Sequence, residues 1–355
     1  MRGVPHNDQV KRSVTPDLIG NMTPAAVFAN CVSGTSTNHS LVSHRHHHEP
    51  TDQIAPEQRP RITRPGYPRA GYAPRPLRAA VHVMARVYGA CVSDADDLVA
   101  SGYDTFYSAW GRSPTLRRIW REHVTGPDYP EEFEHISFLP LRQLQDLAGS
   151  LGLGVDQVLV DLACGAGGPG LWVAKESGAR LVGRDLSRVA VERARERATA
   201  LGMVGRAEFA RGSFGHTGLA ARSADAVMTV DALQYAPDKT KALVEVARIL
   251  RPGGRFAFVA FELDAQRIAG LSLWSDPVGD YRHVLEQAGF EILRYEQIPN
   301  WQDHVNAGFG AVIAEQATLE SELGAAAAAA IVLEASITLE LQPYCGHVLA
   351  AARRT

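Results

Sequence analysis

The sequence predicts an α/β protein with a doubly wound, mostly parallel sheet. Three observations lead to this fold class. From residue 157 onward, short apolar runs alternate with helical segments of amphipathic pattern. A glycine-rich turn directly follows the first of these runs. Turn residues separate the segments, as in Arg251-Pro252-Gly253-Gly254 between a predicted helix and a predicted strand.

The first 75 residues predict a disordered or loosely attached tail, because they lack hydrophobic periodicity and are rich in Pro, Ser, Thr, Asn, His and Arg. The tail contains the histidine run 44–48, but nothing around it promises the rigid frame of a metal site, so none is predicted. Residues 76–151 predict a helical cap that packs over the glycine-rich turn, with helices over 77–88, from Ser93 to Trp110, from Pro114 to Trp120 and over 139–151.

Residues 152–355 predict the sheet domain. The strands are expected at 157–162, 180–185, 206–211, 224–230, 255–262, 290–297 and 344–351. The helices between them are expected near 170–178, 187–201, 238–250 and 278–288. Before the last strand the alternation stops, and residues 301–341 predict a helical insertion over the sheet edge, suited to a lid or to contact with a second copy of the chain.

The composition limits which partners and which cellular compartment are expected. The chain has 355 residues and a formal net charge of −3, so it offers no basic surface for nucleic acid. The apolar run at 324–333 is flanked by acids and predicts an alanine-rich helix, so no membrane span and no secretory signal are expected. The cysteines are scattered, which favours reduced thiols in the cytoplasm; they are Cys31, Cys91, Cys164 and Cys345.

The glycine-rich turn, within 158–170, indicates a cofactor cradle. Its pattern Gly165-x-Gly167-x-x-Gly170 lets the backbone approach a ligand closely, but dinucleotide sites share it. Asp185 ends the second strand, 24 residues after Asp161, where a carboxylate accepts hydrogen bonds from ribose hydroxyls. The alternative for Asp185 is a helix cap next to Ser187. If Asp185 binds ribose hydroxyls, the cofactor contains adenosine.

Four features favour S-adenosylmethionine over a dinucleotide. Asp161 precedes the glycines, where an acid can face a positive methionine end. Pro169 interrupts the orderly helix entry of a dinucleotide fingerprint. The third strand ends in residues 211–214, with a hydroxyl and an aromatic ring suited to adenine. The fourth ends in residues 230–235, with an acid and an amide.

Residues 155–300 resemble the class I S-adenosylmethionine-dependent methyltransferases, in the group that includes ubiquinone/menaquinone-type and sterol-type enzymes. The resemblance rests on five motifs in order: DLACGAGGPG (161–170), VGRDLS (182–187), ARGSF (210–214), SADAVMTVDALQYAPD (223–238) and ARILRPGGRFAFVAFE (247–262). It implies a seven-stranded, Rossmann-like sheet. The region from Tyr103 to Leu151 looks similar to the N-terminal cap of small-molecule members.

The resemblance also implies cofactor-binding residues, taken position by position. Those implied for the methionine part are Asp161, Ala163, Gly165 and Gly167. Those implied for ribose and adenine are Asp185, Leu186, Gly212, Ser213 and Phe214. Asp231 and Leu233 are expected to close over the cofactor, with Gln234 facing the acceptor. The chain departs from the family at Ser213, where an aspartate is frequent, and at Arg184, where an apolar residue is common.

Three residues are candidates for a general base, should the acceptor need one. They are His135, Glu262 and Tyr103, with Tyr107 and His304 as weaker ones. Each has a structural alternative: a loop histidine, a partner for Arg267, and a core tyrosine. Trp274 and Trp301 are expected to wall the acceptor site, and His283 and His347 to be structural.

The sequence therefore predicts methyl transfer to a small, fairly apolar acceptor, a secondary metabolite. Methylation of carbon, oxygen or nitrogen stays open, as does the oligomeric state, for which the N-terminal helices or 301–341 would form the contact. Three alternatives remain: a non-methyl step such as cyclisation in the same pocket, an NAD-dependent oxidoreductase, and a protein that keeps only a relic of the pocket.

Overall fold

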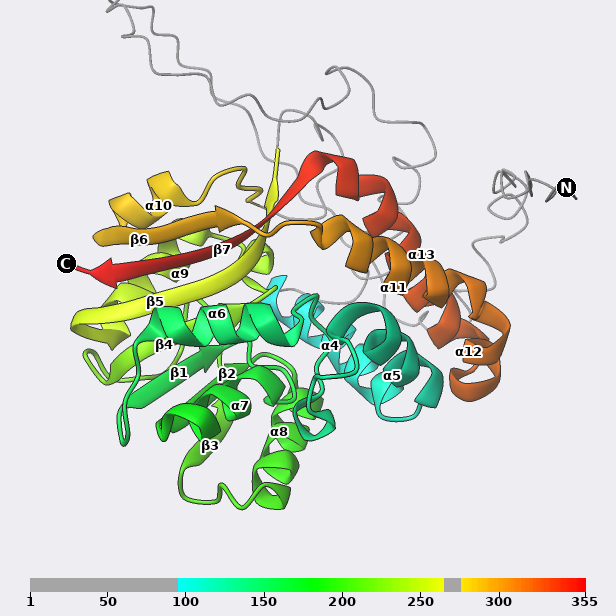
Figure 1. Cartoon of the computed structure of the whole chain (residues 1–355), viewed down its shortest axis with the longest axis horizontal. Helices are drawn as coiled ribbons and strands as arrows, with labels where there is room; N and C mark the ends of the chain where they lie inside the picture. Colours follow the sequence, from blue (N-terminus) through cyan, green and yellow to red (C-terminus); the bar gives the residue numbers. More distant parts are fainter. Residues whose placement is uncertain (1–94, 265–275) are drawn as a thin grey trace, which may run out of the picture. The chain divides into compact units, whose positions relative to one another are not determined.

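The computed structural model describes residues 95–264 and 276–355, and its centre is a seven-stranded sheet (Figure 1). The strand order is β3-β2-β1-β4-β5-β7-β6. Strand β7 runs antiparallel to both of its neighbours, and the other pairings are parallel. The predicted doubly wound, mostly parallel sheet is confirmed. The predicted tail at 1–75 and the helix at 77–88 lie outside the described residues.

The strands lie close to their predicted positions. Their bounds are β1 Val158–Leu162, β2 Arg180–Asp185, β3 Ala207–Arg211, β4 Ala224–Val230, β5 Leu250–Leu263, β6 Phe290–Gln297 and β7 Cys345–Arg354. Strand β5 begins earlier than expected, because Leu250 already pairs with Ala224 ahead of the Pro-Gly-Gly segment. The register shifts between Ala224 and Ala226, which accommodates those turn residues within the strand.

Helices cover both faces of the sheet. On one face lie α6 (Leu141–Leu151), α7 (Gly168–Ser177) and α8 (Arg188–Ala200), and on the other lie α9 (Lys239–Ile249) and α10 (Arg282–Gln287). Side chains alternate along β1, so that Leu159 packs in the first core and Val160 in the second. Ser187 and Asp238 begin α8 and α9, each with a side chain that accepts a backbone N–H.

Helix α6 lies elsewhere than the sequence suggested. We expected it over the glycine-rich turn as part of the cap, but it packs on strands β4, β5 and β7. Its apolar side chains Leu144, Leu147 and Leu151 are buried in the core of that face. The helical spacing correctly predicted an apolar face for this helix, but such a pattern does not determine which part of the fold packs against that face.

The cap and the insertion pack on each other at one end of the sheet (Figure 1). The cap contains α4 (Ala95–Trp110), α5 (Pro114–Trp120), a π-helical turn (Arg121–Thr125) and a 3₁₀ turn (Glu131–Phe133). The insertion contains α11 (Trp301–Ala314), α12 (Gln316–Leu323) and α13 (Ala325–Leu341). The Glu322 carboxylate of α12 accepts hydrogen bonds from Ser113 and Thr115 at the start of α5. The predicted insertion before the last strand is confirmed.

Residues Ala325–Tyr344 have the length and the apolar composition of a membrane-crossing helix, with a mean hydropathy of 1.4. This differs from the sequence expectation, which counted only the run at 324–333. One face of α13 packs on α11 and α12, and the helix contains Glu334. A core helix of a folded domain shows the same features, so the segment is weak evidence for a membrane.

Candidate functional site

The glycine-rich turn between β1 and α7 holds three residues in the left-handed backbone region. Ala163, Gly165 and Gly167 have φ of 55°, 54° and 80°. Asp161 lies beneath the turn, since a Cβ on Gly170 would come within 2.4 Å of its Oδ2. Burial, followed by the charge of Asp185, raises the pKa of Asp161 well above its usual value. The turn therefore exposes backbone to a ligand directly above a buried carboxyl group.

Asp185 joins the end of β2 to this turn. Its Oδ2 accepts the Gly165 N–H at 2.8 Å, and its Oδ1 accepts the Ser187 N–H at 2.8 Å. Burial raises its pKa to about 6, and the hydrogen bonds from the two backbone N–H groups oppose that shift. Both sequence interpretations of Asp185 thus find support, because the carboxylate contacts the start of α8 and also lines the cavity described below.

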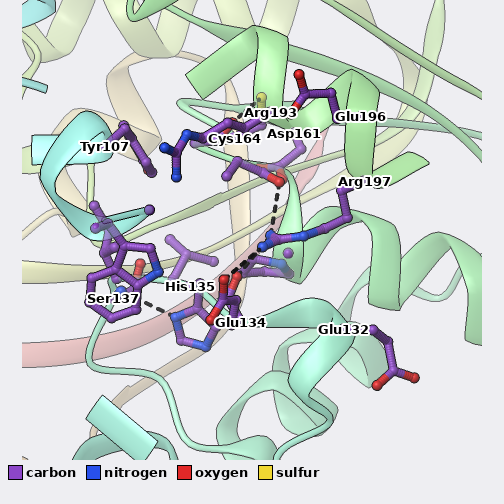
Figure 2. Close-up of a pocket in the computed structure, with 18 of the residues that line it drawn as sticks. Tyr107, Glu132, Glu134, His135, Ser137, Asp161, Cys164, Arg193, Glu196 and Arg197 are labelled. Atoms are coloured by element: carbon purple, nitrogen blue, oxygen red, sulfur yellow. Dashed lines mark hydrogen bonds and ion pairs between the residues drawn. The ribbon is translucent and has the colours of Figure 1, made fainter. Parts of the chain in front are cut away.

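A cavity of about 600 Å³ opens beside the turn, and we call it the polar cavity (Figure 2). Charged side chains surround it, among them Glu132, Glu134, Arg193, Glu196 and Arg197. Arg197 Nη1 donates to the backbone oxygens of Glu134 at 2.8 Å and Ala166 at 2.9 Å. This single guanidinium ties the cap segment to the glycine-rich turn.

A second cavity, of about 930 Å³, adjoins the first, and we call it the apolar cavity. The two share lining residues Tyr107, Ile136, Ser137, Ala163 and Val230. Helices α4, α11 and α13 contribute apolar side chains to its wall, among them Phe106, Phe309 and Ile331. Of the predicted cofactor residues it is lined by Ala163, Asp185, Leu186, Gly212, Ser213, Phe214, Asp231 and Gln234.

The predicted cofactor residues therefore gather around one continuous space, with two exceptions. Asp161, Ala163 and Gly165 line the polar cavity, but Gly167 lines neither cavity. A Cβ on Gly167 would contact Ala194 and Phe209 in the core, so this glycine shapes the turn from behind. Leu233 was expected to close over the cofactor, but it is fully buried in the other core, because the chain turns after Asp231 and directs it inward.

His135 lies on the wall of the polar cavity and is buried (Figure 2). Its Nδ1 accepts the Ser137 N–H at 3.1 Å, so the neutral ring carries its proton on Nε2. Nε2 is buried and has no hydrogen-bonding partner in the described part of the chain. The Nε2–H of neutral His135 is thus shielded from solvent, and a role as base would require the ring to release the Ser137 N–H.

The other two base candidates lie apart from one another. Glu262 lines neither cavity: its carboxylate accepts the Tyr295 hydroxyl at 2.5 Å and the Gln297 amide. Strand alternation explains this, because Phe261 takes the cavity side of β5 and directs Glu262 to the opposite face. The expected alternative partner, Arg267, lies outside the described residues. Tyr103 does line the apolar cavity.

Of the remaining aromatic and histidine residues that were predicted near the site, only some lie there. Tyr107 lies against the glycine-rich turn, where a Cβ on Gly165 would come within 2.1 Å of its hydroxyl. Trp301 lines the apolar cavity as expected, whereas Trp274 lies outside the described residues. His304 contacts the backbone oxygen of His123 and lines neither cavity.

Sequence reasoning missed a buried pair between β4 and β7. His347 Nε2 lies 2.7 Å from Asp231 Oδ1, and the ring stacks on Phe261 with centroids 4.2 Å apart. Asp231 Oδ2 accepts the Phe138 N–H at 2.7 Å, so the acid anchors the cap to the sheet. His347 was expected to be structural, and these contacts support that role. No motif signals the pair, since 116 residues separate its members.

The depressed pKa of His135 predicts a pH-dependent stability. Burial lowers that pKa from 6.5 to about 4, so the unfolded chain binds a proton before the folded chain does as the pH falls. We expect about 2 kcal/mol of the free energy of unfolding to be lost between about pH 7 and pH 5 for this reason. Urea denaturation at the two pH values, for the wild type and His135→Gln, measures it. Equal losses in both proteins would show that His135 is not the source.

The residues around the turn fit an adenosine-containing, cationic cofactor. Two buried carboxyl groups, Asp161 and Asp185, lie on either side of backbone that carries no side chain at Gly165. The hydroxyl of Ser213 and the ring of Phe214 line the adjoining cavity. Within the described residues, no group of histidine, cysteine or acidic side chains could hold a metal ion.

Comparisons with known proteins identify relatives of this chain. Residues 160–258 match the family model described as a methyltransferase domain. The chain is 26% identical over 198 residues to the methyltransferase GfsG of Streptomyces halstedii, covering 52% of this chain and 71% of that one. It is 27% identical over 273 residues to 27-O-demethylrifamycin SV methyltransferase of Amycolatopsis mediterranei, covering 72% and 96%.

A solved structure shares the fold without a methyltransferase name. The [4+2]-cyclase SpnF superposes with a TM-score of 0.58 at 22% sequence identity, covering 72% of this chain and 95% of that one. At this identity the likeness concerns the fold alone. The chemistry of the present chain has to be argued from its own residues and from its relatives in sequence.

Proposed function

Since the chain is a class I S-adenosylmethionine-dependent methyltransferase, we propose that it methylates a small, fairly apolar secondary metabolite. The observation that carries the proposal is the apolar cavity of about 930 Å³, which adjoins the glycine-rich turn and shares lining residues with the polar cavity. Its aromatic and aliphatic walls suit a molecule with a largely apolar body. The relative named as a 27-O-demethylrifamycin SV methyltransferase supports the same class of acceptor.

The residues at the turn suffice to hold the cofactor. Asp161 and the backbone from Ala163 to Gly165 would contact its methionine part, and Asp185 would accept hydrogen bonds from its ribose. Bound S-adenosylmethionine supplies a methyl group on a sulfonium, which is already activated for transfer. The protein therefore has mainly to orient the acceptor and to exclude water from the space between the two.

The described side chains can orient the acceptor and exclude water. Four aromatic rings of the apolar cavity wall pack on one another, three pairs edge to face and the Trp120–Phe138 pair tilted by 45°; they are Trp120, Phe138, Phe261 and Phe309. Such packing keeps the wall rigid. His135 Nδ1 accepts the Ser137 N–H and its Nε2 is shielded from solvent, so we assign His135 a role in holding the segment 135–137 in the cavity wall rather than a role as base.

Calorimetry and product analysis test the proposal. The purified chain should bind S-adenosylhomocysteine, and with S-adenosylmethionine and a panel of hydroxylated or aminated polyketides it should form a singly methylated product together with S-adenosylhomocysteine. Absence of binding would refute the proposal. A product of unchanged mass without S-adenosylhomocysteine would favour the second candidate, a cyclisation in the same pocket, which the fold shared with SpnF keeps open.

Two further expectations stay proposals. A cytoplasmic location is supported by Cys164 and Cys345, which are buried free thiols. Contact between copies of the chain through 301–341 is supported only by the position of α11, α12 and α13 at one end of the sheet (Figure 1).

A further inference from the structure

Helix α13 places one carboxylate in the wall of the apolar cavity. The residues that this helix contributes to the wall recur at helical spacing and are Ala327, Ala330, Ile331, Glu334, Ile337, Thr338 and Leu341. Glu334 lies in the middle of this stripe, between aliphatic side chains one turn away in both directions. Helix α13 contributes no residue to the polar cavity. The predicted ribose and adenine residues that line the same cavity follow strands β2 and β3, whereas α13 belongs to the insertion, so we place this carboxylate on the acceptor side.

Glu334 has no ion pair and no hydrogen bond with any residue in the described ranges 95–264 and 276–355. Two tyrosines of the same cavity, Tyr103 and Tyr235, lie within reach of its charge, and their rings meet edge to face with centroids 5.9 Å apart. Burial raises the pKa of both tyrosines, and the negative charge of Glu334 adds to that shift. Burial alone raises the pKa of Glu334 to about 7.

The other charged groups in this wall come from the sheet side of the cavity. They are Asp185, Asp231, Asp238 and Lys241, with His216 nearby. Lys241 lies against Gly215, and Asp231 is engaged by His347 and Phe138. No described cation thus neutralises Glu334. Glu334 is half-buried, and an unpartnered acid that faces apolar side chains is costly to desolvate unless a ligand completes its hydrogen bonds.

We infer that Glu334 binds a hydrogen-bond donor of the acceptor, a hydroxyl or an amine, and thereby fixes which way the acceptor lies in the apolar cavity. The inference rests on the proposed function and narrows its substrate class to amphipathic molecules, with one donor group on an otherwise apolar body. A leucine at this position would simply continue the aliphatic stripe of α13, so the acid is not needed for packing.

Three ten-carbon probes that differ only in their end group test the inference. Decanol, decylamine and decanoic acid compete with the dye N-phenylnaphthylamine for the wild-type full chain, saturated with S-adenosylhomocysteine. The variants are Glu334→Leu and Glu334→Gln. Glu340→Gln is the matched control, because Glu340 lies on the same helix but is exposed. Thermal melts verify that each variant is folded.

In Glu334→Leu we expect the affinity for decanol and decylamine to fall about tenfold, whereas the affinity for decanoic acid stays equal or rises. In Glu334→Gln the affinity for decanol should fall only about threefold, since the amide oxygen still accepts a hydrogen bond. The affinity for decylamine should fall by the same factor as in Glu334→Leu. A larger preference for decanol than for decylamine in the wild type identifies a hydroxyl as the natural group, and the reverse identifies an amine.

Unchanged affinity for both decanol and decylamine in Glu334→Leu would overturn the inference, as would an equal loss in Glu340→Gln. A different result would contradict the proposed function. Loss of S-adenosylhomocysteine binding by the wild type would contradict it, while intact binding together with unaltered probe affinities would contradict only the role of Glu334.

Discussion

Replacing Asp185 by alanine is expected to weaken the binding of S-adenosylhomocysteine about 100-fold, as measured by calorimetry. The side chain accepts the N–H groups of Gly165 and Ser187, so its removal frees the backbone of the glycine-rich turn and deletes the proposed ribose contact together. Because its pKa is raised to about 6, the carboxylate gains a proton as the pH falls below that value. Binding by the wild type should weaken in the same range.

Asp225→Ala is the matched control for this prediction. Asp225 also accepts a backbone N–H, from Val158 at 2.8 Å, but at the amino end of β1, away from the glycine-rich turn. We expect this variant to be less stable with its cofactor affinity unchanged. Equal affinity in the wild type and Asp185→Ala would remove Asp185 from the cofactor site.

Replacing Gly168 by alanine is expected to lower the free energy of unfolding by about 3 kcal/mol, as measured by urea denaturation. An added Cβ would lie 2.3 Å from the backbone oxygen of Phe133 and 2.6 Å from that of Glu134. Backbone cannot give way as a flexible side chain can, so the cap segment must move away from α7. Since this segment carries His135 and meets Arg197, cofactor affinity should fall too.

Gly310→Ala in α11 is the control for the glycine prediction. A Cβ on Gly310 meets no atom within 4 Å, and alanine is the better helix former, so we expect this variant to gain up to about 1 kcal/mol. A similar change in both variants would show that close packing at Gly168 is not the cause.

Local patterns predicted most of the fold. Strands β2, β4 and β6 have the predicted bounds, because runs of apolar and β-branched residues bounded by turns leave little choice. The glycine-rich turn and Asp185 were predicted for the same reason, since each follows a strand of a parallel sheet, and the carboxyl ends of such strands meet at one edge.

Periodicity could not decide which surface each element meets. The apolar stripe of α6 was predicted, but its position on the sheet rather than over the turn was not. Glu262 was a base candidate because it ends β5, and only the sheet showed that Phe261 takes the cavity side. Leu233 followed a cofactor motif yet is buried in the core.

The sequence by itself determined the fold class, the cofactor and the position of the glycine-rich turn, since these follow from short segments whose order is enough to place them. Only the tertiary structure revealed the apolar cavity that we propose for the acceptor. The apolar cavity joins side chains of α4, α11 and α13 from distant parts of the chain, and the contact of Asp231 with His347 spans 116 residues. Such contacts depend on how the helices and strands pack, so they leave no local pattern. Glu334 is the clearest case: in the sequence it is one acid within an apolar helix, and in the fold it lies in the wall of the apolar cavity that we propose for the acceptor.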